Sequence, residues 1–278
     1  MLRFGTKHRP PSPNDSAHII AIANQKGGVG KTTTACNLAA ALASLDQKVL
    51  LIDADPQGNA STGFAITDRT QNLYHVLALG RPARRAVQPT SVRGLDLIPA
   101  TVDLAGAEIE LVDQEGWKST LTKALAPLKG VYDFILIDCP PALGPLTVNA
   151  LGAADFAIVP LQVEFYALEG LSHLVRIIDR LRKSLNPRLS LGGIVLTMVD
   201  TRNRLAKQVE ADVRQHFGDK VFQTLIPRNV RVSEAPSHGL PVTAYDPKSS
   251  GAQAYMELAL ELLRRHGKAA QPKKARAA

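Results

Sequence analysis

Short apolar runs recur along the chain and alternate with segments whose apolar residues are spaced as on one face of a helix. Each run is continuously hydrophobic and rich in β-branched residues, whereas a strand with one face in water would alternate apolar and polar positions. The runs therefore predict strands that are covered on both faces. They occupy residues 18–24, 48–53, 94–100, 132–138, 155–160, 192–198 and 221–226.

Helical spacing appears between these runs. It begins at Thr33, recurs over residues 168–181 and is found again at about 249–265. The last of these helices would carry on one face Met256, Leu260 and Leu263. This alternation predicts an α/β fold with three layers, in which helices cover both faces of a mostly parallel, twisted sheet. No internal repeat or linker divides the chain, so we expect a single domain over residues 18–266.

The composition is that of an ordinary globular protein, with 278 residues, 45% hydrophobic residues and a mean hydropathy near zero. No apolar run is long enough to span a bilayer, and residues 1–17 lack the apolar centre of a signal peptide, so we expect a cytoplasmic protein. Cys36 and Cys139 are the only cysteines. Two are too few for a disulfide scaffold, and both are expected to be buried, reduced thiols.

The net charge of +8 comes from the two ends of the chain. Residues 1–17 hold three basic side chains against one acid, and residues 264–278 hold six basic side chains and no acid. The body between them is neutral. Because both ends are also rich in Pro, Ala and polar residues, residues 1–17 and 267–278 are predicted to be disordered arms. A basic arm can contact nucleic acid, although solvated disorder is the commoner outcome.

A glycine-rich turn stands between the first predicted strand and the first predicted helix, in the stretch NQKGGVGKTTTACN of residues 24–37. Glycines there let backbone N–H groups curl around an anion at the positive end of a helix. Lys31 would neutralise the β- and γ-phosphates, and the Thr32 hydroxyl would bind Mg²⁺ directly. The loop therefore predicts that ATP and Mg²⁺ bind there. The expected ATP-binding residues are Gly27, Gly28, Val29, Gly30, Lys31, Thr32 and Thr33.

Acidic residues stand where two predicted strands end. Asp53 ends one strand, Asp55 follows it, and Asp138 ends another. In a parallel sheet these ends open onto the crevice that holds the phosphate loop. Asp138 suits the Walker B position, where a carboxylate acts on Mg²⁺ through a coordinated water. A single aspartate in such a place is often a helix cap, but three at strand ends favour the metal-binding interpretation.

The stretch KGGVGKT resembles the signature of the deviant Walker A ATPases, a branch of the P-loop NTPases. The resemblance accounts for Lys26, which the phosphate cradle itself does not need, because the first lysine of that family reaches the nucleotide of the opposite subunit. It implies an ATP-bound homodimer in which Lys26, Lys31 and Asp55 are catalytic, Lys26 contacts ATP, Asp55 positions the attacking water and Asp53 supports the Mg²⁺ shell. The alternative for Lys26 is a surface lysine on a flexible turn.

Further stretches extend the resemblance from residue 18 to about 265 and are similar to those of the ParA/Soj chromosome-partitioning ATPases. They are DADPQGNAS, IPATVDLAGAEIEL, VEFYALEGL, LTMVDTRNRLAKQV and IPRNVRVSEAPSHGLPV. The resemblance implies that Pro227 and Asn229 line the adenine pocket, partly through backbone contacts, although Pro227 is also compatible with a simple strand stop. It also implies that the ATP-bound dimer binds double-stranded DNA without sequence preference, through Arg202 and Arg231.

The charge distribution is consistent with a DNA face at these arginines. Residues 202–231 contain seven basic and three acidic side chains, a local charge of +4 inside a body that is neutral as a whole. Basic side chains bind phosphates regardless of sequence and lose affinity in salt. Further contacts are expected from Arg204, Lys207 and Arg228. A solvated charged helix explains part of the cluster equally well.

The resemblance implies a Mg²⁺-dependent cycle on the nucleoid, in which slow ATP hydrolysis, stimulated by a ParB-like centromere-binding protein, releases the dimer from DNA. A nucleotide-gated scaffold with incidental hydrolysis is the alternative. A small-molecule synthetase built on the same loop would need a substrate motif, and none is recognised.

Two other branches are disfavoured. A membrane-bound relative uses a C-terminal amphipathic helix, whereas residues 267–278 contain no large apolar residue. A related reductase holds an iron–sulfur cluster between its subunits, but Cys36 lies in the helix after the phosphate loop and leaves Cys139 without a second ligand.

Overall fold

A sheet of seven strands crosses the part of the protein that the computed structural model describes, residues 17–164, 167–200 and 202–266. The strand order is β3-β4-β2-β5-β1-β6-β7, and each neighbouring pair is parallel except β3 with β4. The strands are β1 (His18–Ile22), β2 (Val49–Asp53), β3 (Gln88–Pro89), β4 (Leu95–Ile98), β5 (Phe134–Asp138), β6 (Phe156–Gln162) and β7 (Ser190–Thr197).

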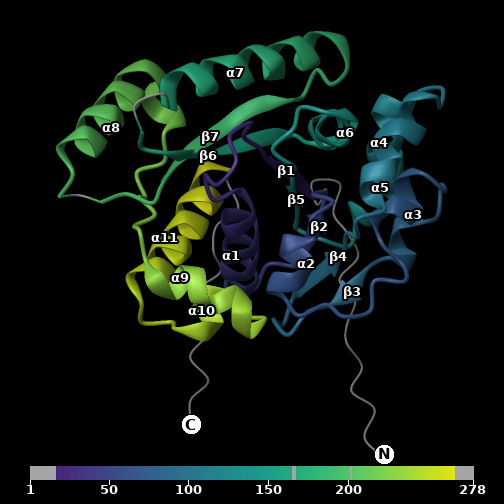
Figure 1. Ribbon diagram of the computed structural model, residues 1–278, viewed down its shortest axis with the longest axis horizontal. Helices are drawn as coiled ribbons and strands as arrows, with labels where there is room; N and C mark the ends of the chain where they lie inside the picture. The colour runs from purple at the N-terminus through teal and green to yellow at the C-terminus, as the bar shows by residue number, and fades with distance from the viewer. Residues whose placement is uncertain (1–16, 165–166, 201, 267–278) are drawn as a thin grey trace, which may run out of the picture.

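Helices cover both faces of this sheet (Figure 1). One face carries α1 (Lys31–Ser44), α2 (Asn59–Gly63), α9 (Val230–Glu234), α10 (Val242–Tyr245) and α11 (Ser250–Arg265). The other face carries α3 (Leu73–Leu77), α4 (Leu104–Val112), α5 (Thr120–Leu125), α6 (Pro145–Ala153), α7 (Ala167–Ser184) and α8 (Arg204–Phe217). The predicted three-layer α/β fold is confirmed. No described helix is long and apolar enough to cross a membrane.

The two predicted arms fall almost entirely outside the described residues, which begin at Ala17 and end at His266. Ala17 was assigned to the N-terminal arm, but it is buried, and its N–H donates to the Lys129 carbonyl at 2.9 Å. The ordered chain therefore begins at least one residue earlier than expected.

Helix α1 supports the loop that precedes it. It is rich in alanine and lies between the sheet and α11, so nearly all of its length is buried. Leu38 and Leu42 are fully buried, and each contributes about 1.5–3 kcal/mol through the removal of its side chain from water. The helix starts at Lys31, two residues before the predicted start at Thr33, because Gly30 adopts the turn conformation that leads into it.

The seventh predicted strand, residues 221–226, is wrong. Isolated bridges hold this segment at Val221 and, just beyond it, at Pro227, and the N–H groups of Phe222 and Ile226 donate to carbonyls of β7 at 2.9 Å. Between them the backbone N–H groups of Gln223 and Thr224 donate to the carboxylate of Glu261, at 2.9 and 3.0 Å. A side chain therefore interrupts the strand ladder at residues 223 and 224, which an apolar run cannot reveal.

The face predicted for α11 is also wrong in part. Leu263 is buried, but Met256 and Leu260 are only partly buried. Tyr255, Leu258 and Leu262 are fully buried, because α11 packs against α1, α9 and α10 as well as the sheet. The short edge strand β3 was not expected, and its proline is compatible with an edge position.

Candidate functional site

The carboxyl ends of three neighbouring strands meet at one edge of the sheet. β5 lies between β1 and β2, and Asp138 is in register with Ile22 on one side and with Asp53 on the other. Because the glycine-rich loop leaves the end of β1, it begins beside Asp138. Parallel register therefore brings together the predicted phosphate loop and the predicted acids.

The glycine-rich loop can curl because two of its glycines adopt backbone angles that other residues rarely take. The φ angle is 74° at Gly28 and 86° at Gly30, in the left-handed region. A Cβ added to Gly27 or Gly28 would meet no atom within 4 Å, so the space beside them is open. The buried Val29 fixes the loop to the sheet, because its carbonyl accepts a hydrogen bond from the Thr197 hydroxyl at 2.9 Å.

The first turn of α1 closes this loop. The Thr34 N–H donates to the Gly30 carbonyl at 2.8 Å and makes the first hydrogen bond of the helix. The N–H groups of Lys31, Thr32 and Thr33 precede that bond, so they are the free donors of a helix amino end. Such an end attracts phosphate through these donors and through the helix dipole.

Lys31 is a buried cation. Its side chain is 7% exposed, and its Nζ donates to the Lys26 carbonyl at 3.0 Å. Burial lowers the pKa of Lys31, whereas the charges of Asp138 and Asp55 act in the opposite direction. An anion beside Lys31 would compensate for the water that its ammonium group has lost.

Asp138 is fully buried, and neither of its carboxylate oxygens has a hydrogen-bond partner among the described residues. Burial and then the charge of Asp53 raise its pKa, and the nearby Thr32 hydroxyl and Lys31 ammonium oppose this shift. An unsatisfied buried polar group costs about 1–3 kcal/mol. A hydrated Mg²⁺ would supply both positive charge and hydrogen-bond donors, so Asp138 and Thr32 fit such an ion.

Asp53 is also buried, but its oxygens are occupied. Its Oδ2 accepts from the N–H and the hydroxyl of Ser61, at 2.8 and 2.6 Å, and its Oδ1 accepts from the Asp55 N–H at 3.3 Å. The Ser61 hydroxyl accepts in turn from the Ala100 N–H at 3.0 Å. Burial raises the pKa of Asp53 to about 6, against the bonds from Ser61. These contacts favour a role for Asp53 in holding the following loop.

Asp55 stands at the start of that loop. Its side chain is nearly buried, and its Oδ1 accepts from the Gln57 N–H at 3.0 Å, which leaves Oδ2 without a hydrogen bond to any described residue. The turn closes where the Gly58 N–H donates to the Asp55 carbonyl at 2.9 Å. Gly58 has a φ of 64°, and a Cβ there would lie 3.1 Å from the Ala100 carbonyl oxygen. Asp55 therefore has one oxygen held by the turn and one available to orient a water.

Lys26 lies outside the cradle that Lys31 occupies. Its side chain is half exposed and forms an ion pair with Glu164, which precedes α7. Its backbone N–H donates to the Asn24 side chain at 3.0 Å. Exposed ion pairs contribute about 0–1 kcal/mol, so Lys26 can exchange this partner for another at little cost. The sequence assigned no role to Glu164, although it lies in the VEFYALEGL stretch.

The two predicted adenine contacts differ in what their side chains offer. Pro227 lines a cavity of about 270 Å³ together with Ser250 and Ala254. The Asn229 amide is already engaged, because it donates to the Ser250 hydroxyl at 2.8 Å and accepts from the Arg231 N–H at 2.8 Å at the start of α9. One N–H and one lone pair of the Asn229 amide therefore remain for a contact with a base, in addition to its backbone.

The two principal DNA-binding candidates are exposed and paired with acids. The Arg202 guanidinium donates to both oxygens of Asp200, at 2.9 and 2.8 Å. Arg231 forms ion pairs with Glu234 at 3.0 Å and with Asp246 at 3.4 Å. These three acids lie outside residues 202–231, for which the basic and acidic side chains are counted in the sequence. The charge around the two arginines is therefore lower than that count predicts.

The remaining candidates, Arg204, Lys207 and Arg228, are exposed and form no ion pair with a described residue. The Arg228 N–H donates to the Val199 carbonyl at 3.2 Å, which places the two basic stretches side by side.

Mg²⁺ binding is expected to weaken as the pH falls through about 6. Both Asp53, with a pKa near 6, and Asp138 are harder to ionise than ordinary aspartates, so at low pH they hold protons that a metal must displace. The affinity for Mg²⁺ should therefore rise with pH by about tenfold per unit for each proton released. Titration of the protein with Mg²⁺, with an ATP analogue bound, measures this affinity. An Asp138→Asn variant should lose the part of this slope that the Asp138 proton contributes, and a slope equal to that of the native chain would contradict this account.

Comparison with known proteins gives matches over most of the chain. The family model described as an AAA domain matches residues 17–191. The chromosome partitioning protein ParA of Caulobacter vibrioides is 58% identical over 251 residues, which cover 89% of this chain and 94% of that protein. The sporulation initiation inhibitor protein Soj of Bacillus subtilis is 52% identical over 246 residues, which cover 88% of this chain and 97% of that protein.

The same fold occurs in solved structures. Cobyrinic acid a,c-diamide synthase from Mycobacterium smegmatis, with bound ADP and magnesium, superposes with a TM-score of 0.79 at 37% identity and covers 92% of this chain and 97% of that one. Proteins that are named for DNA partitioning and for small-molecule synthesis thus share this architecture, and the higher sequence identity is with the partitioning proteins.

Proposed function

The chain belongs to the ParA/Soj family of chromosome-partitioning ATPases, and from this premise we propose that it hydrolyses ATP with Mg²⁺ and acts, in its ATP-bound state, as a dimeric DNA-binding switch. One observation carries the chemical part of the proposal. A buried lysine, Lys31, and a buried carboxyl without partners, Asp138, flank an open glycine loop at the carboxyl ends of neighbouring strands. A phosphate would compensate the buried charge of Lys31, and a hydrated cation would supply the hydrogen-bond donors and positive charge that Asp138 lacks.

The residues divide the work of phosphoryl transfer between them. Lys31 and the free N–H groups of α1 would bind the phosphates, and Thr32 and Asp138 would hold Mg²⁺, Asp138 through water. The ion neutralises charge on the phosphates when it is bound. Asp55 orients the attacking water with its free Oδ2, and no side chain acts as a nucleophile. Catalysis of this kind rests on positioning and on electrostatic stabilisation.

Lys26 is assigned to the nucleotide of a second copy of the chain. It lies outside its own phosphate cradle, and its exposed pairing with Glu164 is easily exchanged. In a dimer each protomer would then contribute a cation to the other site, so the dimer would be stable only while the triphosphate is present. DNA binding would follow the same state, because two basic faces together hold phosphates more strongly than one.

The cellular part of the proposal follows from the family. A ParB-like centromere-binding protein would stimulate hydrolysis, and the protein would be cytoplasmic and associated with the nucleoid. Its intrinsic turnover should be slow, because a switch must persist longer than its binding event. Rapid hydrolysis by the purified protein without DNA or a partner would contradict this view.

Binding to random-sequence duplex DNA tests the proposal directly. We expect binding with ATP, little with ADP or without nucleotide, and a loss of affinity as salt is raised. Arg202→Ala and Arg231→Ala should each weaken binding several-fold and reduce the salt dependence, since each removes a phosphate contact from both halves of the dimer. Arg93→Ala is the matched control, because Arg93 is exposed in a turn far along the chain from these stretches.

Two results would overturn the assignment. Binding that ignored the nucleotide would point to the basic ends of the chain as the contact. The absence of binding in every nucleotide state would favour a small-molecule enzyme, in line with the similarity to the synthase.

A further inference from the structure

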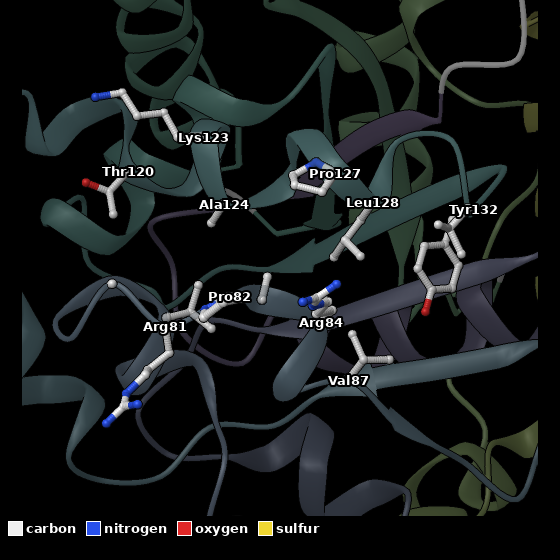
Figure 2. Close-up of a pocket in the computed structure, with 14 residues that line it drawn as sticks. Arg81, Pro82, Arg84, Val87, Thr120, Lys123, Ala124, Pro127, Leu128 and Tyr132 are labelled. Atoms are coloured by element: carbon white, nitrogen blue, oxygen red, sulfur yellow. The ribbon is translucent and has the colours of Figure 1, made fainter.

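A cavity of about 820 Å³ lies apart from the nucleotide site (Figure 2). Its walls come from residues 76–87, which begin in the last turn of α3, and from residues 120–132, which lead to β5. Tyr132 stands before the amino end of β5, whereas Asp138 ends the same strand at the nucleotide site. Small-molecule sites commonly measure about 300–1,000 Å³, so the cavity is large enough for such a ligand.

The interior of this cavity is apolar. Val76, Ala83 and Leu128 are buried in its walls, and the Tyr132 side chain stands among them. The Tyr132 hydroxyl donates to Asp96 at 2.8 Å, so its polar end is satisfied and the ring remains as an apolar surface. The walls therefore suit a hydrocarbon or aromatic body.

The charged groups of this cavity are all cations. Arg81, Arg84 and Lys123 line it, no acidic residue does, and none of the three forms an ion pair or a side-chain hydrogen bond with a described residue. The excess of basic over acidic side chains extends along both walls. Residues 79–92 contain three arginines and no acid, and residues 118–131 contain three lysines and no acid.

Figure 2 shows how these cations are arranged. The end of Arg84 is drawn between Leu128 and Val87, while Arg81 and Lys123 extend outward at one side of the view. A ligand's acidic group bound to Arg84 would therefore lie against the apolar wall. Arg81 and Lys123 would lie farther out from it.

We propose that this cavity binds a small amphipathic anion, namely an acyl chain or an aromatic body that carries a carboxylate. The apolar walls would take up the body of the ligand, and the unpaired arginine would bind its acidic group. This site is independent of the ATP site, and its ligand differs in class from a nucleotide.

Charge argues against the chain's own N-terminal residues as the occupant. The described residues begin at Ala17, whose N–H donates to the carbonyl of Lys129, the residue after Leu128 of the cavity wall. Residues 1–16 contain apolar Leu2 and Phe4, but also three basic residues against one acid. A net positive segment would be repelled by walls that are themselves positive.

Decanoate is the probe for the test, and its uncharged match is decanol. Titration calorimetry would be run on the full chain saturated with Mg²⁺ and ADP, so that the phosphate loop is unavailable. We expect decanoate to bind at one site and decanol to bind at least about tenfold more weakly, because charged hydrogen bonds contribute more than neutral ones. Arg84→Glu should weaken decanoate binding by at least about tenfold, whereas Arg93→Glu changes the same net charge outside the cavity and should not.

A blocking variant makes the location of the site testable. Ala124→Trp places a large ring on the α5 wall and should abolish decanoate binding while ADP affinity stays unchanged. The proposal is overturned if decanoate does not bind, if decanol binds equally well, or if Ala124→Trp and Arg84→Glu both bind decanoate normally. It is also overturned if a full-length Leu2→Ser/Phe4→Ser variant binds far more tightly than the native chain, since residues 1–16 would then be the natural occupant.

Discussion

Replacing Lys26 by alanine is expected to lower ATP turnover by at least about 100-fold, as the removal of a cation supplied across an interface does in related phosphoryl transfers. The affinity for an ATP analogue should change by less than about threefold, because Lys31 and the amino end of α1 form the phosphate cradle without it. With the analogue, light scattering should detect only monomers of the variant, whereas the native chain is expected to form dimers. Turnover and mass are measured on the same preparations.

The control for this variant removes the partner of Lys26 instead. Glu164→Gln leaves the lysine in place and breaks an exposed ion pair worth about 0–1 kcal/mol, so dimerisation should change by no more than about fivefold. If Lys26→Ala still formed dimers with the analogue, the lysine would be an ordinary surface residue and its assignment to the opposite subunit would be wrong.

The second large effect is expected at Asp55. Asp55→Ala should reduce hydrolysis by about 100-fold or more, the typical effect of losing a group that positions or activates a reacting water. Nucleotide binding and the ATP-bound dimer should persist, because Asp55 is not part of the phosphate cradle. The variant should therefore remain on DNA after ATP is added, and the loss of fluorescent DNA from the complex measures its release.

Asp55→Asn separates chemistry from loop structure. The amide oxygen can still accept from the Gln57 N–H, so the turn that closes at Gly58 is preserved while the negative charge is lost. We expect it to be as slow as Asp55→Ala. In cells, normal chromosome partitioning by Asp55→Ala would instead support the scaffold hypothesis, in which hydrolysis is incidental.

Much of the nucleotide site follows from local sequence rules. The strand, the glycine loop and the helix are consecutive in the chain, and parallel register requires Asp53 and Asp138 to lie beside each other once β2 and β5 are neighbours. Buried strands are recognised by continuous apolar runs because both faces are covered. These features depend on short segments or on a general property of parallel sheets.

The features that the sequence missed depend on contacts between distant segments. Glu164 meets Lys26 across 138 positions, and the Asp53 network includes Ala100, which follows a different strand. Glu261 occupies the N–H groups of residues 223 and 224. None of these pairings leaves a periodic signal, so composition and spacing could not have revealed them.

The buried carboxyl of Asp138, which has no hydrogen-bond partner among the described residues, makes the nucleotide-free protein less stable than its fold would allow. A ligand that binds only the folded form adds stability in proportion to the logarithm of its concentration above its dissociation constant. Loss of nucleotide would therefore lower the melting temperature and increase the population that opens to proteases. The cellular lifetime of the protein would then report the nucleotide supply, independently of any partner that reads the switch.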